Sequence, residues 1–194
     1  SKLTQEFRLH FDEKIAEMFQ SIGIREGSVW IEVFHDGENY YFNEVGFRYG
    51  GSVSIYPVDY FYQINQVAAD IHYALTGESC ISEHTSLIRS TLPRKKYYCI
   101  YPVHINAGTI SSISGLDKIA QLENIVYLAT TKYLHDRIES SGSFSQVFAL
   151  VHFVCNTTEE CIQTIDRIHQ MLVVFDEHGN NMVNRMLDVG KIIF

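Results

Sequence analysis

A short segment of the sequence holds the side chains best suited to chemistry. Glu32 and Glu44 flank an Asp-Gly turn signal, and Arg48 and the pair Gly50-Gly51 follow them. Two converging carboxylates can hold a hard cation such as Mg²⁺ at about 2.0 to 2.1 Å, and Mg²⁺ is the ion that commonly bridges nucleotide phosphates. A guanidinium can bind a phosphate or acylphosphate oxygen, and glycines let the backbone approach a ligand closely. The segment therefore predicts a magnesium and phosphate site.

Both glutamates can act on one ion only if the strands that carry them present both to the same face. Residues 29–34 and 39–45 are rich in β-branched and aromatic residues, which predicts a β-hairpin. A two-residue Asp-Gly loop would place Glu44 on the face opposite Glu32. A three-residue Asp-Gly-Glu loop would pair Glu32 with Phe42 and make the glutamates diagonal neighbours, about 7 to 8 Å apart at the backbone. We therefore predict the three-residue loop.

A solvated surface is the alternative interpretation of this hairpin. Half-exposed strands often carry glutamates toward water, and there Arg48 would simply pair with Glu44. Trp30 shares a face with Glu32 and would be either a wall of the site or part of the core. Asn43 immediately precedes Glu44, so strand alternation predicts that it points to the other face.

The elements that position the hairpin are predicted from apolar periodicity. Apolar residues recur every three or four positions over 7–22 and over 61–75, and Gly23 and Gly77 follow these runs. This pattern predicts two amphipathic helices that end at the glycines. In the second half, a Thr-x-x-Glu capping box at Thr157 predicts the start of another helix. The predicted strands of the second half cover residues 97–103, 108–113, 125–130, 146–156 and 182–187.

The hairpin motif resembles the metal-binding hairpin of the ATP-grasp enzymes, the superfamily of biotin carboxylase, carbamoyl phosphate synthetase and D-alanine–D-alanine ligase. The shared pattern is hydrophobic-Glu-hydrophobic, an Asp-Gly turn, and then Glu-Val-x-x-Arg-x-Gly-Gly. The resemblance implies that Glu32 and Glu44 ligate the Mg²⁺ ions that bridge the ATP phosphates, and so bind the nucleotide through the metal. It implies that Arg48 contacts the transferring phosphoryl group, which makes Arg48 the candidate for a catalytic residue and a further contact to ATP.

One position departs from the pattern of this superfamily. The usual motif continues Glu-x-Asn-x-Arg, with the asparagine as a third metal ligand, whereas this chain has Gly46 there. Glycine has no side-chain ligand, so the resemblance leaves open whether one Mg²⁺, two or none is bound. In this respect the motif resembles a carbamoyl phosphate synthetase-like branch of the superfamily, in which variants with glycine at this position occur.

The resemblance is specific over residues 7–77 and weak beyond them. It implies an α+β fold in which residues 1–93 form the C-terminal lobe of an ATP-grasp domain, with an antiparallel sheet and packed helices. Residues 94–194 would form a β-rich α+β C-terminal domain. The lysines and the glycine-rich lid that hold the nucleotide would lie upstream of Ser1, so we expect a fragment that is inactive alone and works with the N-terminal remainder of the same protein.

The resemblance also implies a reaction. The parent protein is expected to be an ATP-dependent ligase that joins a small-molecule carboxylate to an amine or a thiol through an acylphosphate, with ATP and Mg²⁺ as cofactors. The alternative from the residues is a non-catalytic α+β module for binding or oligomerisation, and a homodimer is compatible with either hypothesis.

The composition of the chain disfavours two classes of binding partner. The formal net charge of −8 disfavours nucleic acid and anionic membrane surfaces, and no apolar run approaches the roughly 20 residues that span a bilayer. We expect a cytoplasmic protein. The four cysteines form no C-x-x-C pair and are interpreted as small hydrophobes, and the nine histidines form no metal-binding pair.

Overall fold

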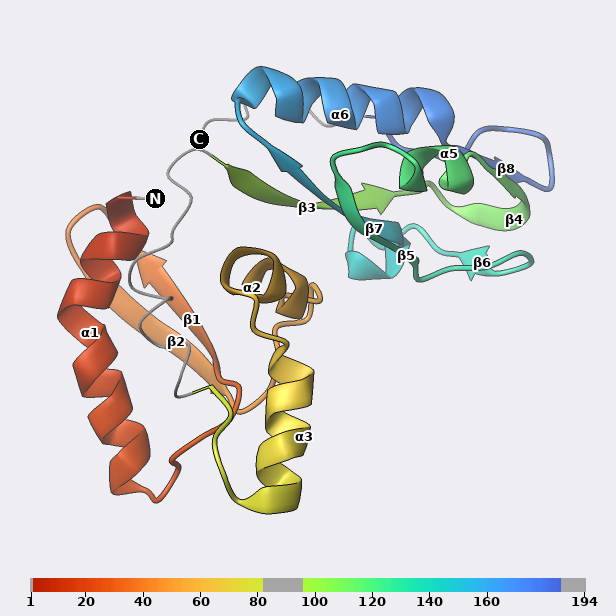
Figure 1. Ribbon diagram of the computed structural model, residues 1–194. Coiled ribbons are helices and arrows are strands. Elements are labelled where there is room, and N and C mark those ends of the chain that lie inside the picture. Colours follow the sequence, from red (N-terminus) through yellow and green to blue (C-terminus); the bar gives the residue numbers. More distant parts are fainter. Residues whose placement is uncertain (1, 82–95, 186–194) are drawn as a thin grey trace. The chain divides into compact units, whose positions relative to one another are not determined.

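The computed structural model describes residues 2–81 and 96–185 (Figure 1). The chain divides into two compact units, residues 1–92 and 93–194, which are described separately below. The boundary predicted between residues 93 and 94 lies outside the described residues and stays a prediction.

The first unit begins with helix α1 (Lys2–Ser21), followed by the hairpin strands β1 (Trp30–His35) and β2 (Tyr40–Gly46). Figure 1 shows α1 lying along the hairpin. Aromatic rings form the contact: the Phe7 centroid lies 5.4 Å from that of Tyr40, and the Phe11 centroid lies 5.3 Å from that of Phe42. Because side chains alternate along a strand, α1 covers one face of the hairpin and leaves the other face to Glu32 and its neighbours.

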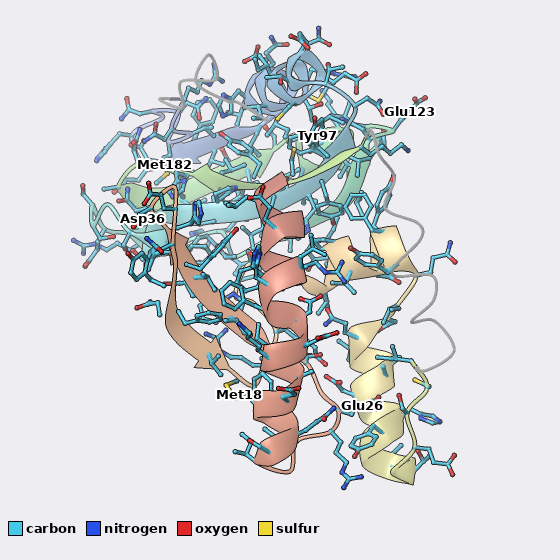
Figure 2. All side chains as sticks on the ribbon, turned by 90° about the vertical axis from the view of Figure 1, so that its left-hand side faces the viewer. Met18, Glu26, Asp36, Tyr97, Glu123 and Met182 are labelled. Atoms are coloured by element: carbon cyan, nitrogen blue, oxygen red, sulfur yellow. The ribbon has the colours of Figure 1, made fainter. Side chains whose placement is uncertain are left out.

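The turn of the hairpin has four residues, not the predicted three. His35 pairs with Tyr40, so residues 36–39 form the loop. The Asp36 carboxylate accepts hydrogen bonds from the backbone amides of Glu38 and Asn39, at 2.9 and 2.8 Å. These bonds hold the tip of the hairpin, where Figure 2 labels Asp36. An aspartate that satisfies two amides stabilises this longer loop, which explains why the three-residue prediction is wrong.

Two helices follow the hairpin where a single helix was predicted. Helix α2 (Ile55–Tyr62) and helix α3 (Gln66–Thr76) are separated by a break at residues 63–65. Gln63 has a left-handed φ of 54°, and the Asn65 side chain accepts a hydrogen bond from the Ala68 amide as the N-cap of α3. The prediction of one helix was wrong because apolar spacing continues across a break that the backbone and the cap create. Gly77 ends α3 with φ 73°, as predicted.

In the second unit, an antiparallel sheet has the order β3-β7-β5. Its strands are β3 (Tyr97–His104), β7 (Val147–Cys155) and β5 (Ile125–Thr130). These bounds lie within two residues of the predicted ones. The runs of β-branched and aromatic residues therefore identified all three strands of this sheet.

A second antiparallel sheet of this unit has the order β6-β4-β8. Strand β4 (Gly108–Ser114) was predicted, whereas β6 (Arg137–Ile138) and β8 (Val173–Asp176) were not. Around Val183 of the last predicted strand, residues 182–187, the structure has an isolated bridge to Ile105. The last two residues of that range, 186 and 187, lie outside the described residues.

Helix α6 (Thr158–Met171) runs along the sheet that contains β3 and β7 in Figure 1. Its predicted cap is confirmed, because the Thr157 hydroxyl accepts a hydrogen bond from the Glu160 amide at 3.2 Å. Residues 96–185 also contain helix α5 (Leu116–Ala120) and the 3₁₀ turn η1 (Phe144–Gln146). One buried core cluster includes Val103, Phe148, Phe153, Ile165 and Ile168, each at most 3% exposed.

Antiparallel sheets with packed helices confirm the predicted α+β class. No helix within residues 2–81 and 96–185 combines the length and apolar character that a membrane span requires.

Candidate metal and phosphate site

Glu32 and Glu44 are direct cross-strand partners. The register shifts after Glu32, because Val33 pairs with Phe42 while Glu32 pairs with Glu44, so Asn43 is the extra residue of a β-bulge. Opposed residues of an antiparallel pair point to the same face. The bulge therefore brings the two carboxylates together, although the predicted pairing of Glu32 with Phe42 is wrong.

Asn43 belongs to the same constellation. Its side-chain amide donates a hydrogen bond to Glu32 Oε1 at 2.6 Å. Strand alternation predicted that Asn43 faces away from the glutamates, and the bulge overturns that prediction because the extra residue breaks the two-residue period. One amide and two carboxylates thus lie together on the face that α1 does not cover.

Arg48 lies on this face although it follows the end of β2. Strand β2 ends at Gly46, and the Arg48 side chain folds back so that Nη2 lies 3.9 Å from Glu44 Oε1. Its guanidinium carbon lies 5.0 Å from the centroid of the Trp30 ring, and Nη1 donates to the carbonyl of Tyr49 at 3.0 Å. The Arg48 and Glu44 side chains remain about half exposed. A cation that is stacked and tethered in this way is held in place and still accessible to a ligand.

Gly46 makes the position of Arg48 possible. Gly46 lies opposite Trp30 in the register, and a Cβ at this position would lie 3.3 Å from Arg48 Cγ and 3.6 Å from Trp30 Cε3. Even a Cβ at this position would therefore require the Arg48 side chain to shift by a few tenths of an ångström. The departure from the usual asparagine has a structural reason, since the space of that side chain is filled by the arginine.

Asp70 of α3 anchors the Arg-Tyr-Gly-Gly loop, residues 48–51, through hydrogen bonds. The Tyr49 hydroxyl donates to Asp70 Oδ2 at 2.5 Å, and the Ser28 hydroxyl donates to the same oxygen at 3.0 Å. Burial raises the pKa of Tyr49, and the neighbouring Asp70 carboxylate raises it further. Asp70 thus ties the loop that carries Arg48 to Ser28, two residues before the start of β1.

Gly50 lies so close to Ser54 and Trp30 that a side chain here would have little room. A Cβ at Gly50 would lie 2.8 Å from Ser54 Oγ and 3.2 Å from Trp30 Cδ1. The Gly50 amide instead donates to Ser54 Oγ at 3.1 Å. A Cβ on Gly51 would meet nothing within 4 Å, so only the first glycine of the pair is demanded by packing.

The charges of the site are unbalanced. Two carboxylates oppose each other on a half-exposed face, and like charges directly opposite destabilise a strand pair by several tenths of a kcal/mol. Arg48 lies near Glu44, and Glu32 receives a neutral amide from Asn43. The arrangement leaves about one negative charge, which favours a cation between the glutamates.

Two aromatic side chains extend this face toward the turn. Phe34 and Tyr41 are cross-strand partners, and Phe34 lies two positions from Glu32 and therefore on the same face. Both are more than half exposed, at 58% and 52%. The face thus combines an apolar end with a carboxylate end.

Sequence reasoning selected Glu32, Glu44 and Arg48, and the structure brings these three together. It missed Asn43, Tyr49 and Asp70. Asn43 was missed because a bulge leaves no signal in apolar alternation, and Asp70 because it is far from the motif in sequence. A tyrosine between the arginine and the glycines was the only local signal for Tyr49.

No protein-family model matches the sequence, and no curated protein matches it significantly. Among solved structures, an L-amino acid ligase from Bacillus licheniformis matches with a TM-score of 0.68 and 22% identity, covering 89% of this chain and 41% of its own length. A phosphoribosylglycinamide synthetase from Anaerococcus prevotii matches with a TM-score of 0.67 and 14% identity, covering 85% of this chain and 41% of its own. The chain therefore spans about two fifths of each. Both are ATP-grasp enzymes, so the fold indicated by the hairpin motif is confirmed: this chain has the fold of an ATP-grasp lobe.

Proposed function

We propose that this chain carries the metal and phosphate end of the ATP site of a carboxylate–amine or carboxylate–thiol ligase. The observation that carries the proposal is the direct opposition of Glu32 and Glu44, with Arg48 Nη2 3.9 Å from Glu44 Oε1. The shared fold with two ATP-dependent ligase structures supports the class of reaction.

The residues present fit a magnesium ion. Two opposed carboxylates and an adjacent amide form an all-oxygen donor set, which is the type that Mg²⁺ prefers. Glu32 and Glu44 would hold the ion, and Asn43 keeps Glu32 oriented toward it. When bound, Mg²⁺ neutralises charge on the β- and γ-phosphates of ATP.

The protein's own part in the reaction is positioning and charge stabilisation. Arg48 binds an oxygen of the γ-phosphoryl group as this group is transferred from ATP to the substrate carboxylate, a step that releases ADP and forms an acylphosphate. An amine or thiol then attacks the acyl carbon, and inorganic phosphate leaves. Stacking on Trp30 and the bond to the Tyr49 carbonyl keep the Arg48 guanidinium in one orientation during both steps.

The remainder of the nucleotide site is proposed to come from protein beyond this lobe. The chain covers 41% of each similar ligase structure, so more than half of each has no counterpart here. The described part of the first unit has few buried apolar side chains, namely Ile64 and Ala69, whereas Phe34, Phe42 and Phe47 are about half exposed. A small core with exposed aromatic side chains supports the proposal that further protein packs against this unit. We therefore propose that the lobe alone binds metal and phosphate and does not turn over ATP.

The proposal is tested by calorimetric titration of the chain with tripolyphosphate, which mimics the phosphates of ATP without adenine. We expect binding in Mg²⁺ and none after chelation of the metal. Glu44→Gln and Arg48→Ala should each weaken it at least tenfold. Glu38→Gln, which removes a charge at the exposed turn of the same hairpin, should bind as the native chain does. Equal binding by all four proteins would overturn the proposal.

A non-catalytic binding module is the second candidate. Gly46 favours it, because this position has no third ligand and its space is filled by Arg48. If the module is non-catalytic, tripolyphosphate affinity will be the same with and without Mg²⁺.

A further inference from the structure

Three cysteines that are distant in sequence meet in the second unit. Cys99 lies on β3, Cys155 ends β7 and Cys161 lies in the first turns of α6. The Cys99 sulfur is 3.6 Å from that of Cys155 and 3.8 Å from that of Cys161, and all three sulfurs lie within 4.8 Å of one another. In the parts of the chain that the structure describes, no other three potential metal-ligating residues of the His, Cys, Asp and Glu types gather so closely.

Three separate elements fix the positions of these sulfurs. Cys99 pairs with Phe153 and Cys155 pairs with Tyr97, so the two cysteines are diagonal neighbours on adjacent strands. Cys161 is held by the capped start of α6, where the Thr157 hydroxyl accepts from the Glu160 amide. A rigid arrangement lowers the cost of ordering ligands around an ion.

The spacing suits one ion at the centre. An ion that binds three sulfurs as a pyramid, with bonds of about 2.3 Å and bond angles of about 95° to 109°, holds these sulfurs about 3.4 to 3.8 Å apart. The observed separations of 3.6 and 3.8 Å are close to this range. Only small side-chain movements are therefore needed to bind three sulfurs to one ion.

The surroundings select the charge of the ion. Cys155 and Cys161 are 2% and 3% exposed and belong to the hydrophobic core, while Cys99 is partly exposed and offers an entry. A net charge at this buried site would be poorly solvated, so a trivalent ion, whose charge balances that of three thiolates, fits better than a divalent one.

We propose that Cys99, Cys155 and Cys161 form a three-sulfur site for one soft trivalent ion of the arsenite class. Neutral arsenous acid, As(OH)₃, enters past Cys99 and exchanges its oxygens for the three sulfurs. Three As–O bonds break and three As–S bonds form; each thiol proton leaves with a hydroxide as water. The arsenic stays As(III), so neither oxidant nor reductant is required. This site is independent of the proposed ligase activity.

The test is native mass spectrometry of the reduced full chain mixed with an equimolar amount of arsenite, with a phosphine as reductant. The fourth cysteine, exposed Cys80, supplies a matched control. We expect one arsenic, less three hydrogens, bound to the native chain and to Cys80→Ser. Cys99→Ser and Cys161→Ala should each retain none, and circular dichroism checks that they are folded.

The result with the native chain and Cys80→Ser decides the proposal even if the core variants fail to fold. Absence of bound arsenic from the native chain would overturn the proposal. Binding by the native chain that is lost in Cys80→Ser would also overturn it, because the arsenic would then be bound through Cys80. Stoichiometric binding of Zn²⁺ in preference to arsenite in a competition would overturn the charge selection.

Discussion

Glu32 and Glu44 face each other across the hairpin as direct cross-strand partners. This relationship arises from a four-residue turn and a bulge at Asn43, which together place both carboxylates on the face that α1 leaves uncovered. Two like charges in this position weaken the hairpin by themselves. Their presence is therefore better explained by a bound cation than by stability of the strand pair.

Neutralising one carboxylate should stabilise the hairpin in the absence of metal. Glu32→Gln removes the like-charge pair, and its amide oxygen can still accept the Asn43 hydrogen bond. We expect the free energy of unfolding in chelator to rise by about 0.2 to 1 kcal/mol. With Mg²⁺ the native chain should gain stability and the variant should not. Urea unfolding under both conditions measures this, with Glu38→Gln as a control that should change in neither. A variant less stable than the native chain in chelator would contradict the account.

The Arg48 position should be visible in tryptophan fluorescence, because Trp30 is the only tryptophan of the chain. Gly46→Asn introduces a side chain whose Cβ alone would lie 3.3 Å from Arg48 Cγ, and the larger amide group should move Arg48 off the indole ring. We expect the tryptophan emission to shift to longer wavelength. We also expect the free energy of unfolding to fall by about 0.5 to 1 kcal/mol, because the cation–π stacking is lost.

Arg48→Ala should give the same spectral shift as Gly46→Asn, since both remove the guanidinium from the ring. Arg25→Ala, at an exposed arginine of the same unit, should leave the spectrum unchanged. Emission of Gly46→Asn identical to that of the native chain would contradict the steric role of Gly46.

The tip of the hairpin should be sensitive to acid through Asp36. Hydrogen bonds from the backbone of Asn39 and Glu38, and from the Tyr41 hydroxyl, lower the pKa of Asp36 to about 2. Because the folded-state pKa lies below the unfolded value of about 3.9, the charged form stabilises the fold above pH 4. That contribution is lost as the pH falls from about 4 to 2.

Carboxyl chemical shifts measured by NMR should therefore give Asp36 a midpoint near 2, and Tyr41→Phe should raise it. A midpoint at the ordinary aspartate value in the native chain would show that the turn is not held as described.

The loop anchor should matter for phosphate binding as well as for stability. Tyr49→Phe removes the donor to Asp70 and leaves that carboxylate with the Ser28 hydroxyl. We expect a loss of about 1 kcal/mol of unfolding free energy and a several-fold loss of tripolyphosphate affinity, because Arg48 is adjacent in the loop. Urea unfolding and calorimetry measure the two effects. Tyr133→Phe, at an exposed tyrosine of the second unit, is the control, and equal effects of the two substitutions would contradict the anchor.

Local patterns predicted much of this structure. Strands such as β5 and the capped start at Thr157 were found because neighbouring residues in the sequence determine them. The break between α2 and α3 was not, since the apolar spacing runs on through Gln63 while its backbone turns left-handed. Similarly, Glu32 and Glu44 were selected correctly from their spacing, but on a register that the structure replaces with a bulge.

Contacts between distant segments could not be predicted from such patterns. Asp70 meets Tyr49 and Ser28 only because α3 packs against the start of the hairpin. The sulfurs of Cys99, Cys155 and Cys161 meet only because β3, β7 and α6 converge, and no C-x-x-C spacing signals it. Short strands such as β6, with two residues, carry no detectable period at all.

The most direct test of the central claim is paramagnetic broadening of backbone amide signals by Mn²⁺ in place of Mg²⁺. The account predicts that broadening at low Mn²⁺ concentration is centred on Glu32, Asn43 and Glu44, and that Glu44→Gln abolishes it while Glu38→Gln does not. Broadening centred elsewhere in the chain, or unchanged in Glu44→Gln, would contradict the claim that the opposed glutamates form a metal site.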